Sequence, residues 1–162
     1  MAGPEALEPE QLEAYFALME VSSLLRHDVE RQLKDAGGLS YVQFQLLATL
    51  GDRPTGSMRM TDLADGVVYS RSGLTYQAGL LEKAGYVTRA AVPDDERSVA
   101  VTLTDAGREV LRAVFPGHLE VVHRLLFAET SSADVDAIRN VLGRVRDHMR
   151  TAPPRSAATR RR

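Results

Sequence analysis

The amino-acid sequence predicts a mainly α-helical fold with a small β-hairpin wing, a winged helix-turn-helix with N- and C-terminal dimerisation helices. Two short helical patterns joined by a tight turn lie in the middle of the chain, and two strand-like patterns follow them. Long amphipathic helical patterns flank this central part on both sides. With 162 residues, 44% of them hydrophobic and 26% charged, the composition is that of one globular domain.

The N-terminal helix is expected over residues 8–36, because apolar side chains recur there three or four positions apart. Gly37 and Gly38 should end it, since glycine readily adopts the backbone conformation that closes a helix. Ser40 followed by Gln43 has the spacing of a capping box. This box predicts a second helix, which is apolar on most faces and therefore central.

The two short helices of the helix-turn-helix come next. After a loop, residues 57–60 allow at most one small strand. The first short helix should start at Thr61, whose hydroxyl can cap it. The second should have Ser70 as its N-cap and stop at Gly85.

The period of the pattern changes after this helix to the alternation typical of strands. Two such runs flank the polar segment 93–97, which predicts a hairpin with its loop there. Thr104 is expected to cap the following helix. Pro116 and Gly117 should break or kink that helix before it resumes.

The last helix should begin after Ser131 or Ser132 and carries a nearly continuous apolar stripe. The stripe consists of Val135, Ile138, Val141, Leu142, Val145 and Met149. The helices at both ends hold more apolar surface than one compact unit of this size can cover. A partner chain is the natural cover, so we expect a homodimer; packing of both helices on their own domain is the alternative.

These patterns divide the chain into three regions. Residues 1–36 and 116–150 form a helical dimerisation region, residues 37–115 the winged helix-turn-helix, and residues 151–162 a disordered basic tail. The tail carries four arginines and no acid, whereas the whole chain has a net charge of −2.

Composition excludes several classes of protein. The chain has no cysteine, which excludes disulfides, thiolate metal sites and thiol-based redox sensing. No apolar run approaches the roughly 20 residues of a membrane span, and the N-terminus lacks a signal-peptide pattern, so we expect a cytoplasmic protein.

The sequence does not indicate an enzyme, and we expect no catalytic residue, metal or cofactor. The four histidines are scattered along the chain without a metal-binding spacing. A zinc site built from His118, Glu120 and His123 has poor spacing for one helix face. Solvated histidines are the preferred interpretation.

Three segments carry a recognisable pattern. They are Ser70–Thr75 (Ser-Arg-Ser-Gly-Leu-Thr), Leu81–Val87 (Leu-Glu-Lys-Ala-Gly-Tyr-Val) and Asp94–Gly107 (Asp-Asp-Glu-Arg-Ser-Val-Ala-Val-Thr-Leu-Thr-Asp-Ala-Gly). With these segments the chain resembles the MarR family of bacterial transcription regulators, over about residues 10–150 in element order. The resemblance implies a homodimer that binds double-stranded DNA and usually represses genes. It also implies release of DNA when a small molecule, often phenolic or aromatic, binds between the dimerisation and DNA-binding regions.

The resemblance places the start of the recognition helix in the major groove and the wing near the minor groove. The DNA-binding residues that it implies are Ser70, Arg71, Ser72, Thr75, Tyr76 and Arg97. The free N–H groups of a helix N-terminus suit phosphate anchoring, and Arg71 can reach a guanine edge or a phosphate. Two alternatives stay open: Ser70 acts only as an N-cap, and Arg97 is held by Asp94 or Asp95.

The wing and its charge depart from what a DNA-binding surface usually shows. Val92 and Glu96 stand where wings of the family commonly have Asp and Arg, which weakens the expected wing contact. Residues 57–89 carry four basic and three acidic side chains, and residues 90–107 carry one arginine and four acids. A winged-helix protein that binds another protein instead of DNA is therefore the alternative function.

A small aromatic or phenolic effector is expected where the first, second and fifth helices converge. The candidate ligand-binding residues are Phe16, Met19, His27, Tyr41, Phe44, Phe115 and His118. Aromatic and methionine side chains at helical spacing also build hydrophobic cores, and that interpretation stays open for each of them.

Overall fold

The structure is a computed structural model that describes residues 6–67, 70–92 and 95–151. The order of elements is α1 (Pro9–Gly37), α2 (Tyr41–Gly51), β1 (Ser57–Arg59), α3 (Met60–Val67), α4 (Arg71–Lys83), β2 (Val87–Val92), β3 (Asp95–Leu103), α5 (Asp105–Val122), the π-helical turn η1 (His123–Phe127) and α6 (Ser132–Arg150). The predicted fold class, mainly helical with a small β-hairpin wing, is confirmed. Among the described helices, none has the length and hydrophobicity that a membrane span requires.

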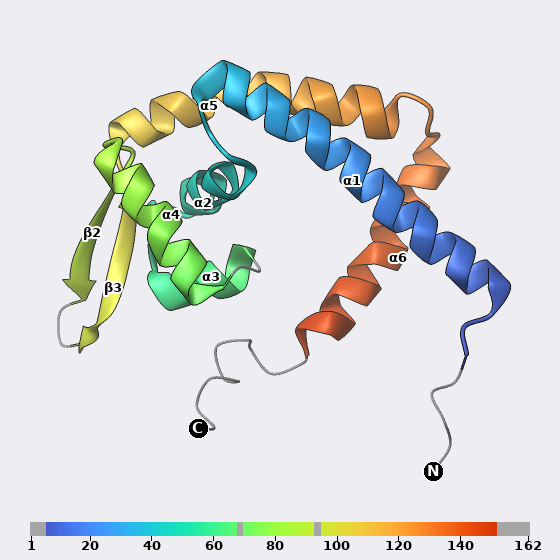
Figure 1. Ribbon diagram of the computed structural model, residues 1–162, viewed down its shortest axis with the longest axis horizontal. Coiled ribbons are helices and arrows are strands. Elements are labelled where there is room, and N and C mark those ends of the chain that lie inside the picture. Colours follow the sequence, from blue (N-terminus) through green and yellow to red (C-terminus); the bar gives the residue numbers. More distant parts are fainter. Residues whose placement is uncertain (1–5, 68–69, 93–94, 152–162) are drawn as a thin grey trace, which may run out of the picture.

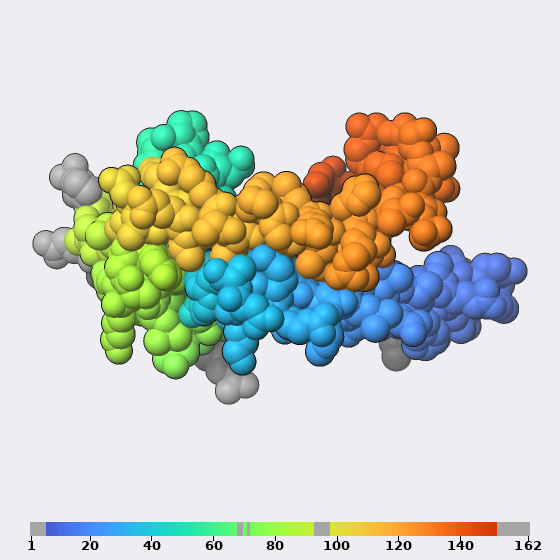
Figure 2. Space-filling view, turned by 90° about the horizontal axis from the view of Figure 1, so that it is seen from above, coloured from blue at the N-terminus to red at the C-terminus, as the bar shows by residue number. Residues whose placement is uncertain are grey.

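The molecule is elongated, and helices α1 and α5 lie side by side (Figure 1). The hairpin of β2 and β3 lies at one end, beside α4; the short helix α2 packs beneath α5, and α3 packs against α2 and α4. The N-terminal half of α1 and α6 extend toward the other end (Figure 2). The winged helix-turn-helix, which we call the winged unit, therefore lies at one end of the molecule. The flanking helices, which are α6 and the N-terminal half of α1, extend to the other end.

Side-chain caps start most of the helices, as the sequence predicts. At the start of α2 the backbone N–H of Ser40 donates to Gln43 Oε1 (3.0 Å) and the N–H of Gln43 donates to Ser40 Oγ (3.3 Å). Ser131, not Ser132, caps α6. The prediction for α3 is wrong by one residue, because α3 begins at Met60 directly after β1. The half-buried Met60 packs against the core, so the chain turns into the helix before Thr61.

The three strands form one antiparallel sheet in the order β1-β3-β2. Ser57 of β1 lies opposite Thr102 of β3, and their hydroxyl oxygens are 2.8 Å apart. The predicted loop over residues 93–97 is too long, because β3 begins at Asp95 and this residue pairs with Val92. Strand pairing uses backbone groups, so it continues outward past the polar side chains that suggested a loop.

Of the predicted break or kink at Pro116 and Gly117, the break is wrong, because α5 continues through both residues and the chain stays helical to Phe127. Proline removes one N–H donor and crowds the preceding turn. Here α1 packs along the same stretch, and Gln32 Nε2 donates to the carbonyl oxygen of Val114 at 3.2 Å. This contact holds α1 against α5 beside Pro116, whereas the carbonyl group that loses its helical N–H partner to the proline is that of Arg112.

The turn between α4 and β2 is tied to the start of α5. The backbone of Gly85 has φ +77°, and its carbonyl accepts a hydrogen bond from Thr104 Oγ1 (2.7 Å). Thr104 Oγ1 in turn accepts from the N–H of Gly107 (3.1 Å). A Cβ at Gly107 would overlap the carbonyl oxygen of Tyr86. Glycine is thus required at this position because the first turn of α5 lies directly on the preceding backbone.

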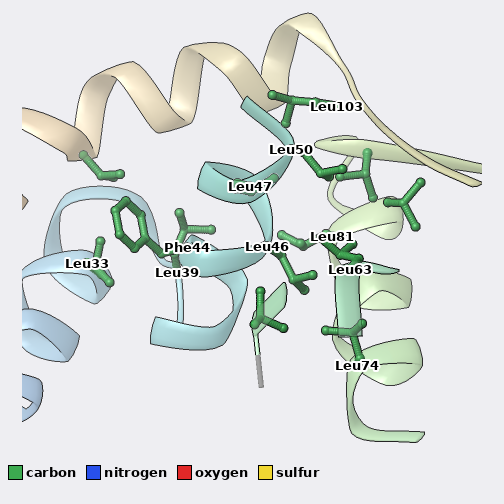
Figure 3. Close-up of a cluster of buried hydrophobic side chains, with 14 of the residues drawn as sticks. Leu33, Leu39, Phe44, Leu46, Leu47, Leu50, Leu63, Leu74, Leu81 and Leu103 are labelled. Carbon is green, nitrogen blue, oxygen red and sulfur yellow. The ribbon is translucent and has the colours of Figure 1, made fainter. Parts of the chain in front are cut away.

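One hydrophobic core lies between α1, α2, α3, α4, the sheet and α5 (Figure 3). Leu33, Leu47, Leu63 and Leu74, from four different helices, have no exposed surface. Within the described chain, every buried apolar side chain lies between Val29 and Val114. The core therefore belongs to the winged unit and to the C-terminal part of α1 that covers it.

The flanking helices, by contrast, expose large apolar side chains. Phe16 and Leu24 on α1 are each 62% exposed, and Met149 on α6 is 70% exposed. The stripe predicted on α6 is present, but no residue of that helix is buried. We call the exposed apolar side chains of α6 and of the N-terminal half of α1 the flanking surface. The predicted basic tail lies outside the described residues from position 152 onward.

Candidate nucleic-acid interface

The outer face of α4 presents three of the predicted DNA-binding residues together. Ser72, Thr75 and Tyr76 are exposed, and Tyr76 keeps 65% of its surface accessible. On the opposite face Leu74 and Leu81 are buried in the core. The burial of one face therefore fixes which side of the helix is presented to a partner.

Ser70 stands at the N-terminus of this helix and acts as its cap. Its Oγ accepts a hydrogen bond from the N–H of Gly73 at 3.3 Å. This supports the capping interpretation of Ser70 and leaves the remaining N–H groups of the first turn directed outward. Arg71 begins α4 and Arg97 lies in β3, but their side chains lie outside the described part, as do the alternative partners of Arg97.

A carboxylate on α4 holds the wing. Glu82 Oε2 accepts from Arg89 Nε (2.8 Å) and Nη2 (2.6 Å), and Glu82 Oε1 accepts from the backbone N–H of Arg89 (3.1 Å). The hydrogen bonds and the charge of Arg89 hold the pKa of the Glu82 carboxyl below its usual value. Sequence reasoning missed this pair, because its members lie on a helix and a strand with a turn between them.

The Glu82–Arg89 pair also changes the charge balance of the surface. Arg89 is one of the four basic residues between positions 57 and 89, and its charge is balanced within the protein. Arg59, on β1, is exposed and donates to Ser98 Oγ at 3.4 Å. The face is thus less positive than a count of its basic residues indicates.

A second polar contact joins α4 to α2. Gln43 Nε2 donates to Gln77 Oε1 at 3.1 Å, in a partly buried position. Gln43 is the capping-box residue of α2, so its Oε1 is already engaged by the N–H of Ser40. The sequence indicated the cap but not this contact across 34 positions of the chain.

Three of the predicted effector residues come together between α2 and α5. The ring of Phe44 lies 4.6 Å from that of His118 and 6.5 Å from that of Phe115. Desolvation lowers the pKa of His118, and its buried Nδ1 has no hydrogen-bond partner among the described residues. We call Phe44, Phe115 and His118 the aromatic cluster.

The other four candidates lie outside this cluster. Tyr41, half-buried, precedes Phe44 on α2, and the guanidinium of Arg26 lies 5.0 Å from the centre of its ring. Phe16, Met19 and His27 are exposed on α1. A shallow hollow between α1 and the end of α5 is lined mainly by charged residues and contains none of the seven candidates. In the described chain, no three histidine or carboxylate side chains are placed to hold a metal ion.

Comparisons with known proteins agree with this architecture. The structure resembles that of Sco3205 from Streptomyces coelicolor, a MarR family transcriptional regulator solved in complex with DNA, with a TM-score of 0.85 and 31% identity. The match covers 91% of this chain and 92% of that one. The transcriptional activatory protein BadR of Rhodopseudomonas palustris (strain ATCC BAA-98 / CGA009) is 31% identical over 140 residues, 84% of this chain and 78% of BadR.

The transcriptional repressor MprA of Escherichia coli (strain K12) is 29% identical over 123 residues, 76% of this chain and 69% of MprA. All three proteins are named as transcriptional regulators and none as an enzyme. The sequence model of the MarR family matches residues 37–98, from the end of α1 into β3.

A helix-turn-helix with an exposed second helix and an adjoining antiparallel hairpin defines a winged helix-turn-helix protein. The extent of the similarity to BadR and Sco3205 identifies the family. This chain belongs to the MarR family of transcriptional regulators.

Proposed function

We propose that this regulator is a repressor, without catalytic activity, that reads double-stranded DNA through the outer face of α4. The observation that carries the proposal is the exposure of Ser72, Thr75 and Tyr76 on a helix whose N-terminus also faces outward. Backbone N–H groups and hydroxyls at such an end anchor phosphates, and Arg71 supplies base contact. Access to DNA implies a cytoplasmic location.

The regulator acts in this proposal as a homodimer. Its helical dimerisation region comprises residues 1–36 and 116–150, and residues 37–115 form the DNA-binding unit. The flanking surface supports pairing, since exposed apolar stripes of this size mark sites of association. Two recognition helices related by a two-fold axis require a pseudo-palindromic operator with half-sites about one helical turn apart.

Effector binding is assigned to the aromatic cluster together with Tyr41. Flat apolar walls suit a phenolic or aromatic ring, and the unpartnered Nδ1 of His118 offers one hydrogen bond. The exposed Phe16, Met19 and His27 are assigned to the pairing surface of α1. Such an effector releases DNA by favouring a dimer whose half-site spacing no longer fits the operator.

Selection of bound sequences from random duplex DNA tests the DNA-binding function. We expect two-fold symmetric sites, and we expect Ser72→Ala and Tyr76→Ala to weaken binding in gel shifts while Ser132→Ala, at the start of α6, does not. If the wild type enriches no sequence and shifts no duplex even at low salt, the function fails. The near-neutral charge of the face then favours the second candidate, a module that binds another protein.

A thermal-shift screen of phenols, quinones and aromatic acids tests the effector site. Calorimetric titration of each stabilising compound follows, with and without operator DNA. Operator and effector must weaken each other's binding by the same factor. Equal affinities in the two titrations would exclude that compound as the effector.

A further inference from the structure

The side-chain amide of Gln43 is used at both of its ends. Its Oε1 accepts from the backbone N–H of Ser40 (3.0 Å), which closes the cap of α2. Its Nε2 is thereby directed to α4, where it donates to Gln77 Oε1 (3.1 Å). The cap fixes which end of the amide faces α4, so the contact has a defined donor and a defined acceptor.

From this arrangement we infer that Gln43 is a positioning residue for the recognition helix. Through Gln77 it fixes α4 against the first turn of α2 in the orientation that presents Ser72, Thr75 and Tyr76 to DNA. The inference rests on the proposed DNA-binding function and adds the residue that sets the angle of the recognition helix α4.

The position of Gln77 on α4 supports a role for its hydrogen bond to Gln43. Gln77 follows Leu74 by three residues and precedes Leu81 by four, so it lies along the buried apolar row of α4. It is half-buried, and a polar group in such a place is costly unless it is hydrogen-bonded. In the described chain Gln43 supplies the only hydrogen bond of its side chain. A change in the relative placement of the two helices therefore breaks a bond that no other described residue replaces.

The same turn of α2 carries Phe44, the member of the aromatic cluster that lies on this helix. Phe44, the next residue after Gln43, is 5% exposed and contacts the ring of His118 on α5. A helix turn moves as a unit, so a displacement of Phe44 also displaces the amide of Gln43. The hydrogen bond between Gln43 and Gln77 thus connects the proposed effector site to the recognition helix α4.

Gln77→Met tests the inference without disturbing the cap. It removes the acceptor for Gln43, keeps a similar side-chain length and adds no charge. We expect operator affinity, measured by fluorescence anisotropy on the intact homodimer, to fall about three- to tenfold, the effect of one partly buried hydrogen bond. The matched control is Gln45→Met, also half-buried on α2 but without a hydrogen bond to α4, which should bind as the wild type does.

Two charged variants and their combination separate positioning from charge. In Gln43→Glu the carboxylate still caps α2 and the amide of Gln77 can turn to donate; in Gln77→Glu the amide of Gln43 still donates. Each single variant should therefore bind better than Gln77→Met at a salt concentration that screens the added charge. In the double variant two carboxylates face each other, and neither can donate a hydrogen bond. Its loss of affinity should exceed the sum of the single losses, again by about three- to tenfold.

Wild-type affinity of Gln77→Met, or strictly additive losses in the double variant, would overturn the inference. A variant that only lowers the free energy of unfolding while its folded dimer binds operator normally would equally show a structural role and no positioning. Failure of the wild type to bind any duplex refutes the proposed function itself and is seen before any variant is compared.

Discussion

The helices of the winged unit and the flanking helices follow the same amphipathic pattern, but the two regions differ in whether the chain itself buries their apolar faces. Between Val29 and Val114 the apolar faces pack on one another and close a core within one chain. On α6 and the N-terminal half of α1 the apolar faces remain exposed. Periodicity therefore shows that a helix has an apolar face, whereas only the structure shows whether the chain itself covers it.

This difference implies two sources of stability. The core of the winged unit gains from burial in each chain separately, and its contribution does not depend on protein concentration. The flanking surface gains only when a second copy covers it, so its contribution rises with concentration. The predictions below test this division.

The largest effect is expected from Leu142→Arg on α6. It places a charge in the proposed seam, and an uncompensated buried charge costs about 3–5 kcal/mol. We expect sedimentation at micromolar concentration to show a dimer for the wild type and a monomer for the variant. Asn140→Arg, on the opposite face of the same helix, should remain a dimer. A monomeric wild type would refute the proposed pairing.

The next effect concerns the core itself. Leu47 has no exposed surface, and Leu47→Ala should lower the free energy of unfolding by about 2–5 kcal/mol. Urea denaturation should give this loss at every protein concentration. Leu142→Ala, in contrast, should weaken the pairing of the two chains, so it should lower the stability most at low protein concentration, where the dimer dissociates. The midpoint of its urea denaturation should therefore shift with protein concentration. The same concentration dependence for both variants would contradict the division between the two regions.

A smaller effect is expected at the start of the recognition helix. If Arg71 contacts a guanine edge, Arg71→Ala should lose about 1–3 kcal/mol of base discrimination. Selection of operators with the variant should then give a relaxed sequence at one position of each half-site. Arg53→Ala, in the loop after α2, serves as the control. Identical operators for wild type and Arg71→Ala would show that Arg71 only positions the DNA backbone.

The smallest effect is a pH dependence from the aromatic cluster. Desolvation lowers the pKa of His118 below its ordinary value of 6.5, so near that pH the unfolded chain binds more protons than the folded one. The free energy of unfolding should therefore decrease as the pH falls from about 6.5 toward the folded-state pKa. His118→Phe should reduce this slope in urea denaturations at a series of pH values, and His148→Asn, exposed on α6, should not. An unchanged slope in His118→Phe would exclude His118 as its source.

Local signals in the sequence were sufficient for most of the fold. Ser40, Ser70, Thr104 and Ser131 cap helices as predicted, because a cap depends on residues within one turn. Pro116 does not end α5, because a proline costs the helix one hydrogen bond but does not prevent helical pairing on either side of it, and α1 packs along the same stretch. Local rules thus identify the residue that weakens a helix but do not decide whether the helix ends there.

The candidate site was only partly accessible from the sequence. The exposed face of α4 followed from its periodicity, and three of the seven residues expected to converge, Phe44, Phe115 and His118, lie together, while the other four do not join them. The contact of Gln43 with Gln77 could not be predicted, because both are ordinary glutamines 34 positions apart. Such pairs depend on the angle between two helices, which a single sequence does not determine.

Because α5 is a single helix, a tilt at one of its ends displaces the other end. Its 18 residues span roughly 27 Å at 1.5 Å per residue, from the base of the wing to the flanking helices. A tilt of about 5° at one end would displace the other by roughly 2 Å over that length. Phe115 and His118 lie between the two ends of α5, so an effector bound at the proposed site would act on the helix between the wing and the flanking helices. A tilt of α5 would have to be taken up at its two ends, where Gly107 lies against the backbone of Tyr86 and where η1 leads toward α6.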